Sequence, residues 1–94
     1  MIVYKNISGD SGVRAYGLGP DYIVVQFTRD KFSRDKMYLY TYESAGSSSI
    51  DEMKKLAEGG KGLCTYIAKN VKKKFAKMVD TGCLIVNGEY FYAI

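Results

Sequence analysis

The chain has 94 residues, a formal net charge of +4, nine tyrosines and no histidine. This length predicts a single domain, residues 1–94, and a hydrophobic content of 47% argues against a disordered chain. The absence of histidine excludes Ser–His and Cys–His catalytic pairs and leaves a structural zinc site without common ligands. Since the acids form no paired carboxylates either, we expect a protein that is not an enzyme and that holds no metal or cofactor.

The cysteines and the hydropathy of the chain predict its cellular compartment. Cys64 and Cys83 form no metal-spaced pair and fit buried free thiols in a reducing compartment. No apolar run approaches the roughly 20 residues of a membrane span, and no signal-peptide pattern opens the chain. We therefore expect a cytoplasmic protein without a membrane partner, either in a bacterium or in a phage-infected cell.

The first part of the chain predicts β-strands. An apolar run at residues 2–4 predicts a short strand, and residues 8–12 have the composition of a turn. Alternation from Val13 predicts a second strand. Residues 22–28, rich in β-branched and aromatic side chains, predict a third. The residues of this third strand expected to face the core are Ile23, Val25 and Phe27.

A charged loop over residues 29–36 precedes the next predicted strand, residues 36–42. With the two strands before it, this strand should form an antiparallel meander. Alternation places three tyrosines on one of its faces: Tyr38, Tyr40 and Tyr42. The sequence leaves open whether this face is exposed, where it could stack bases or contact a protein, or covered as part of the core.

Two helices are predicted to follow. Ser49 and Glu52 fit a capping box that begins the first helix, and Gly59 and Gly60 end it. Residues 62–79 have apolar side chains at helical spacing and predict one long second helix. Its apolar positions include Leu63, Ile67, Val71, Phe75 and Met78. Its opposite side is rich in lysine and has no acid.

The chain ends in a predicted hairpin over residues 83–94 with Asn87-Gly88 as a type I′ turn. The interpretation places four residues on one face, namely Leu84, Val86, Tyr90 and Tyr92. It places three on the other, namely Ile85, Glu89 and Phe91. Because both faces carry apolar side chains, the hairpin should either join the main sheet under the long helix or form a homodimer contact. The dimer is favoured, in which case deletion of residues 83–94 should leave a folded monomer.

These elements predict an α+β fold: an antiparallel β-meander with two helices packed on one face and an additional C-terminal hairpin. Several stretches match the sequence pattern of a known small domain. They are residues 11–17, residues 23–27, Tyr38 with Tyr40, and Lys61-Gly62 followed by Tyr66, Ile67 and Phe75. In these the chain resembles the KTSC domain, a small domain found at the C-terminus of some lysyl-tRNA synthetases. The resemblance implies a KTSC-like core at residues 11–79 and implies RNA binding. The long loop at residues 29–36 and the terminal hairpin depart from the family pattern.

The basic side of the predicted long helix is the first candidate site. On a helical wheel Tyr66 falls among lysines, so it could stack a base while ammonium groups neutralise phosphates. The candidate nucleic-acid-binding residues are Tyr66, Lys69, Asn70, Lys72, Lys73 and Lys77, together with Tyr38 and Tyr40 of the predicted strand. The alternative is a solvated helix face with Tyr66 lying against the edge of the sheet.

The glycine-rich turn between the predicted helices is the second candidate site. Gly60, Lys61 and Gly62 could cradle an anion, because glycines let backbone N–H groups converge at a helix N-terminus. The alternative is a turn that needs left-handed glycines. The sequence thus favours a small binding module for RNA or single-stranded DNA. A protein-interaction module, such as a phage or mobile-element inhibitor of a host protein, and a binder of a phosphorylated small molecule are the alternatives.

Overall fold

The computed structural model describes residues 1–7, 9, 12–28 and 35–94. Five strands form one antiparallel sheet in the order β1-β2-β3-β4-β5: β1 (Ile2–Val3), β2 (Val13–Leu18), β3 (Tyr22–Phe27), β4 (Lys36–Thr41) and β5 (Lys77–Val79). The helical segments are α1 (Tyr42–Ala45), α2 (Ser47–Gly59), α3 (Leu63–Tyr66) and the π-helical η1 (Ile67–Val71). A separate hairpin consists of β6 (Cys83–Val86) and β7 (Glu89–Tyr92). The α+β fold is confirmed, while most of the predicted turn at residues 8–12 and loop at residues 29–36 lies outside the described residues.

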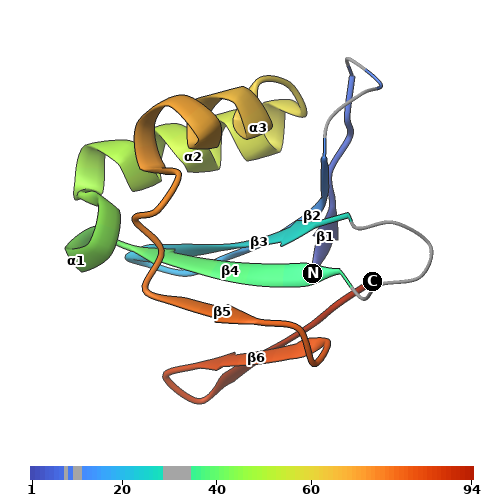
Figure 1. The fold of residues 1–94 in the computed structure, drawn as a ribbon, viewed down its shortest axis with the longest axis vertical. Helices are drawn as coiled ribbons and strands as arrows, with labels where there is room; N and C mark the ends of the chain where they lie inside the picture. The colour runs from blue at the N-terminus through green and yellow to red at the C-terminus, as the bar shows by residue number, and fades with distance from the viewer. Residues whose placement is uncertain (8, 10–11, 29–34) are drawn as a thin grey trace.

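The sheet separates two hydrophobic clusters, so the molecule has three layers (Figure 1). In β3, Ile23 and Val25 belong to the cluster under the helices, as predicted, and Phe27 packs against it. The alternate residues Tyr22 and Val24 belong to the cluster under the hairpin. A strand covered on both faces has an almost continuous apolar sequence, which accounts for the apolar run of β3.

The predicted long helix over residues 62–79 is wrong. Its helical part ends at Val71, and residues 77–79 form β5, which pairs antiparallel with β4. A continued helix would bring Lys77 next to Lys73 and Lys74, at spacings of four and three residues, where their like charges would repel one another. Instead, Phe75 packs against aromatic rings of β4, and the Ala76 N–H donates to the Leu39 carbonyl at 2.7 Å. Pairing with the open edge of β4 and burial of Phe75 therefore prevail over helical periodicity.

The helix start predicted from Ser49 and Glu52 is also wrong, because Ser49 lies inside α2. The capping box is found one helix earlier. The Thr41 hydroxyl accepts from the Ser44 N–H at 3.0 Å, and the Ser44 hydroxyl accepts from the Thr41 N–H at 3.0 Å. The predicted end of α2 is confirmed: Gly60 has φ 74°, and its N–H donates to two carbonyls of the last turn.

The hairpin turn is confirmed, but the predicted faces of the hairpin are wrong. Asn87 and Gly88 have φ values of 50° and 83°, as a type I′ turn requires. Cross-strand partners share a face, and the register pairs Leu84 with Phe91 and Val86 with Glu89. Leu84, Val86 and Phe91 therefore point together into the second cluster. The outer face exposes three apolar residues: Ile85, Tyr90 and Tyr92.

The position of the hairpin corrects one of the two placements predicted for it, while the homodimer contact stays a prediction. It does not join the five-stranded sheet under a long helix. It packs on the sheet face opposite the helices (Figure 1). A buried amide of β3 holds the segment after β7 in place: the Gln26 Oε1 accepts from the Ile94 N–H at 2.9 Å, and the Gln26 Nε2 donates to the Ile94 carbonyl at 3.2 Å. The same Nε2 donates to Asp35, whose carboxylate also pairs with Arg14 at 2.7 Å.

Candidate nucleic-acid interface

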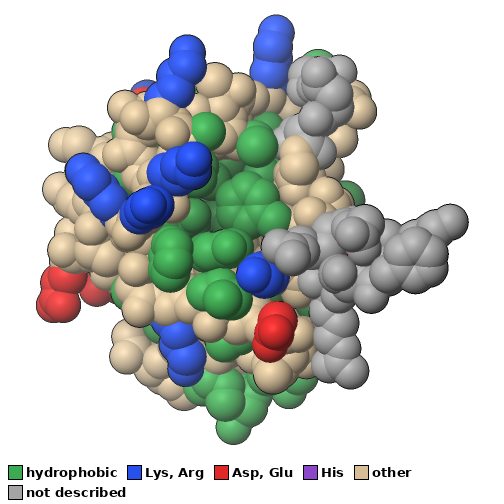
Figure 2. All heavy atoms as spheres, viewed as in Figure 1, with side chains coloured by type: hydrophobic (Ala, Val, Ile, Leu, Met, Phe, Trp, Pro, Cys, Tyr) green, Lys and Arg blue, Asp and Glu red, His purple; other side chains and the backbone are tan. Residues whose placement is uncertain are grey.

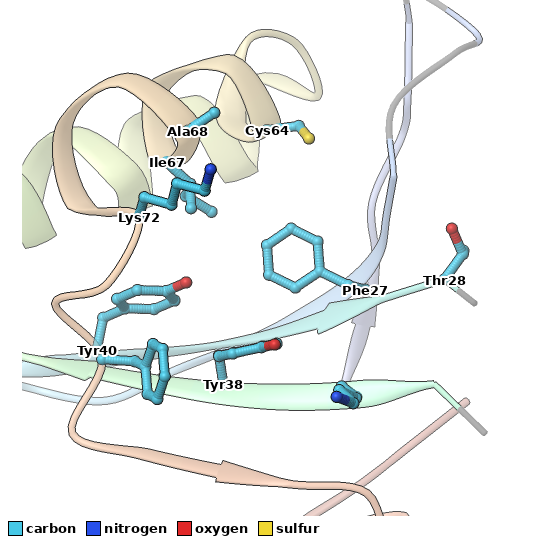
Figure 3. Close-up of a pocket in the computed structure, with 10 residues that line it drawn as sticks. Phe27, Thr28, Tyr38, Tyr40, Cys64, Ile67, Ala68 and Lys72 are labelled. Carbon is cyan, nitrogen blue, oxygen red and sulfur yellow. The ribbon is translucent and has the colours of Figure 1, made fainter. Parts of the chain in front are cut away.

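A cavity of about 320 Å³ opens between the sheet and the segment α3–η1. The sheet contributes Phe27 and Thr28 from the end of β3 and Lys36, Tyr38 and Tyr40 from β4. The helical segment contributes Cys64, Ile67 and Ala68, and the chain after it contributes Lys72 and Phe75. In Figure 3 the rings of Phe27 and Tyr40 project into the space below this helical wall. The size and the mainly apolar lining are those of a small-ligand site.

Tyr38 is the centre of the aromatic cluster in the cavity. Its ring meets Phe27 edge to face at 5.4 Å and Phe75 at 4.9 Å between centroids. It stacks on Tyr40 at 6.3 Å with an angle of 23° between the rings. These tyrosines lie side by side because alternate residues of a strand point to the same face. The predicted Tyr38/Tyr40 face is therefore the one turned towards the helices, with Tyr40 only 1% exposed and Tyr38 partly exposed in the cavity.

Two of the described residues that line the cavity are charged, and both are lysines. Lys36 begins β4 two residues before Tyr38, so its side chain leaves the sheet on the cavity side. Lys72 follows η1 and lies on the helical side (Figure 3). Asp35 is directed elsewhere by its bonds to Arg14 and Gln26. An anion entering the cavity would therefore meet positive charge from two walls and no acid from the described residues lining it.

Lysines also flank the cavity residues Ala68, Lys72 and Phe75 in the chain. Lys69, Lys72, Lys73 and Lys74 are exposed, and no ion pair joins them to an acid within the described part of the chain. We call these four residues the lysine ridge. Figure 2 shows apolar side chains gathered in a hollow with Lys or Arg side chains around it and an Asp or Glu side chain below it. Two other cations are engaged: Lys54 donates to the Gly19 and Pro20 carbonyls, and Arg14 pairs with Asp35.

The structure brings together only some of the residues predicted to bind nucleic acid. Tyr38, Tyr40 and Lys72 line the cavity, and Lys69 and Lys73 belong to the lysine ridge. Three others lie apart from the cavity lining. Tyr66 is partly buried against the helical cluster, the Asn70 amide donates to the Tyr66 carbonyl at 3.1 Å, and Lys77 belongs to β5. The aromatic residues that line the cavity are thus Phe27, Tyr38, Tyr40 and Phe75, and Tyr66 is not among them.

Sequence reasoning missed Phe27, Lys36 and Phe75 as cavity residues. The signal for Lys36 was available, because Lys36, Tyr38 and Tyr40 alternate along one strand. Phe75 could not be found in this way, since its position depends on the end of the helix four residues earlier. Phe27 was expected in the core, and it does pack against the helical cluster while also lining the cavity.

The predicted anion site at Gly60, Lys61 and Gly62 is a tight turn between α2 and α3. Gly60 has φ 74° and Gly62 has φ 84°. A Cβ at Gly60 would meet the Lys5 Cβ at 2.5 Å, and the Gly60 carbonyl accepts from the Ile7 N–H. Packing and backbone conformation thus account for the glycines. Anion binding at this turn stays a prediction.

Burial in the cavity wall raises the pKa of Tyr40 above its ordinary value of 10.0, and the neighbouring Tyr38 and Cys64 raise it further. Burial also raises the pKa of Tyr16 and of Tyr22. Because the folded state holds these phenols neutral, their contribution to stability is complete below pH 10 and is lost as the pH rises towards the folded pKa.

We therefore expect the free energy of unfolding to fall between pH 9 and pH 11, since the unfolded tyrosines ionise near pH 10. Urea titrations at these two pH values measure the fall. The fall should be smaller in Tyr40→Phe, which removes one of the shifted groups. An identical fall in both proteins would show that Tyr40 does not contribute.

Within the described ranges, no helix is long and apolar enough to span a membrane. Among the same residues, no three histidine, cysteine or acidic side chains gather where they could hold a metal ion. Comparisons with known protein families, curated proteins and solved structures found no match to this chain.

Proposed function

We propose that this domain is a non-enzymatic module that binds single-stranded nucleic acid. The observation that carries the proposal is the aromatic cavity whose charged lining residues are Lys36 and Lys72. Aromatic rings bind unstacked bases, and lysines bind the phosphates between them. The lysine ridge extends the positive charge beyond the cavity, and the resemblance to the KTSC domain also implies RNA binding. A mainly neutral aromatic ligand would leave this charge unexplained.

Binding should weaken steeply with salt, because phosphate contacts release counterions. For a single strand, about five contacts, by Lys36 and the four ridge lysines, lower the affinity roughly 130-fold between about 50 and 200 mM salt. Fluorescence anisotropy with labelled 12-nucleotide RNA and DNA strands measures this dependence, and the matching duplexes test for preference. The absence of binding at the lowest salt would refute the proposal.

Charge-removing variants test the lysine ridge. The triple variant Lys72→Gln, Lys73→Gln, Lys74→Gln should lower affinity and reduce the salt slope by about two, since each lost phosphate contact removes about 0.7. Lys55→Gln is a suitable control, because Lys55 is an exposed lysine on α2 near Glu52 and does not line the cavity. Equal losses in Lys55→Gln and in the single variant Lys73→Gln, each of which removes one charge, would mean that overall charge and not the ridge controls binding.

A second candidate function is protein binding through the outer face of the hairpin. Tyr90 and Tyr92 stack there at 6.3 Å, are 59% and 60% exposed, and have Ile85 beside them on the same face. Exposed tyrosines of this kind are common at protein interfaces, including those of homodimers. Affinity purification with and without nuclease distinguishes the two functions, because a direct protein partner survives nuclease treatment and is lost in Tyr92→Ser.

A further inference from the structure

We propose that the cavity takes one unstacked base of the strand while Lys36 and Lys72 contact the phosphates on the two sides of that base. This inference rests on the proposed function and names its unit of recognition. The preferred minimal ligand is then a nucleoside with a phosphate at both its 5′ and its 3′ position. A nucleoside monophosphate would use only one of the two lysines.

The size of the cavity favours a single ring system. Its volume of about 320 Å³ lies at the lower end of the usual range for ligand pockets, roughly 300–1,000 Å³. The base is therefore separated from its neighbours in the strand. Such separation is inexpensive in a single strand, whereas a duplex would first have to break a base pair.

The aromatic cluster gives the cavity surfaces suited to a flat ring. Phe27 and Phe75 each stand steeply against the Tyr38 ring, at 88° and 75°. A base that stacks on one of these rings meets the edge of another, and both are favourable arrangements for aromatic systems. Ile67 and Ala68 close the helical side with apolar atoms. These contacts depend on a flat ring and would be absent for a phosphate or a sugar alone.

Polar groups in the cavity can contact the edge of the base. Within the described residues, the hydroxyl groups of Tyr38 and Tyr40 have no hydrogen-bond partner, and no buried side-chain polar atom is left unsatisfied. These hydroxyls therefore remain open to solvent or to a ligand. The Thr28 hydroxyl donates to the Gly12 carbonyl at 3.2 Å, which leaves its oxygen available as an acceptor.

The two lysines come from opposite walls, which is the reason for proposing a strand and not a mononucleotide. Lys36 projects from the sheet at the start of β4, and Lys72 projects from the chain after η1. A base inserted between the walls places its two flanking phosphates outside the mouth, one towards each wall. The lysine ridge continues the positive charge from Lys72 and would guide the following phosphate.

The first test uses the unaltered protein and four ligands, with binding followed by amide NMR shifts. They are uridine 3′,5′-bisphosphate, uridine 5′-monophosphate, ribose 3′,5′-bisphosphate without a base, and inorganic phosphate. We expect the bisphosphate nucleoside to bind at least about tenfold more tightly than the monophosphate, since it gains one charged contact. Loss of the base should weaken binding about 5- to 150-fold.

Variants locate the binding. Phe27→Leu should weaken binding of the bisphosphate nucleoside but not of the ribose bisphosphate, whereas Lys36→Gln should weaken both. Tyr90→Leu, an exposed aromatic residue on the hairpin, is the control and should bind both ligands as the unaltered protein does. Thermal melts test whether each variant is folded. If a variant is unfolded, the comparison of the four ligands still tests the inference, because it uses the unaltered protein.

The outcomes separate the inference from the proposed function. If 12-nucleotide strands bind with a steep salt dependence but the ligands with and without a base bind equally, the base-capture inference is overturned and the function stands. Equal binding of the monophosphate and the bisphosphate would overturn the two-phosphate arrangement and favour a small phosphorylated ligand. If no strand and no small ligand binds at low salt, both the inference and the function fail.

Discussion

Replacement of Phe91 by alanine is expected to lower the free energy of unfolding by about 3–5 kcal/mol, as for other buried aromatic residues. Phe91 is 9% exposed and lies in the cluster between the hairpin and the sheet. Its ring meets Tyr22 edge to face at 5.9 Å. It also lies so close to Gly17 that a Cβ there would come within 2.5 Å of the ring. The loss would be a large part of the 5–15 kcal/mol typical of a domain.

Tyr90→Ala is the matched control, because Tyr90 precedes Phe91 in β7 but points outward and is 59% exposed. We expect it to cost less than about 1 kcal/mol, mainly through its contact with Tyr92. Urea unfolding followed by circular dichroism measures both variants. Similar losses at the two positions would contradict the assignment of the inner and outer faces of the hairpin.

The same cluster changes the expected result of deleting residues 83–94. Deletion would uncover Val24, Met37 and Leu39, which are at most 8% exposed in the intact domain. It would also remove the backbone partner of the buried Gln26 amide. The hairpin is thus part of the core, and the folded monomer expected from the sequence should not form. A truncated protein with a cooperative unfolding transition would contradict this conclusion.

Most of the fold could be predicted because local rules and tertiary contacts agree. The Asn87-Gly88 turn fixes its hairpin, Gly60 ends α2, and alternation identifies the central strands. The local sequence rules failed where pairing with a segment distant in the sequence determined the secondary structure. Residues 77–79 have helical periodicity, but the free edge of β4 makes them a strand. No pattern within those residues shows that such an edge is available.

The candidate site was predictable in its residue types and less so in its geometry. Lysines and tyrosines pointed to a polyanion, but a helical wheel extended beyond Val71 placed Tyr66 at the centre of the site. Once the chain leaves the helix, Phe75 packs against Tyr38 and Tyr40 and completes an aromatic wall. The site therefore combines segments that are distant in the sequence. It forms because the helix ends at Val71, an end that the helical periodicity of residues 62–79 did not indicate.

Tyr40→Ala is expected to cost about 3–5 kcal/mol in free energy of unfolding, the second large loss of stability. Tyr40 is 1% exposed and belongs to the cluster under the helices, where it contacts the rings of Tyr38 and Phe75. Alanine would leave a void beside the cavity, into which Phe75 could move only by leaving Tyr38. Tyr40→Phe keeps the ring and should cost less than about 1.5 kcal/mol, because the hydroxyl has no partner among the described residues.

The comparison of Tyr40 with Tyr38 separates the core from the site. Tyr38 is partly exposed, so Tyr38→Ala should cost less stability than Tyr40→Ala, yet it removes the ring at the centre of the cavity. Tyr38→Ala should therefore remain folded at 25 °C and lose about 5- to 150-fold in affinity for a single strand. Urea unfolding and anisotropy on the same samples measure both quantities. Full affinity in a folded Tyr38→Ala protein would mean that the aromatic wall supports the fold and that strand binding depends on the lysines alone.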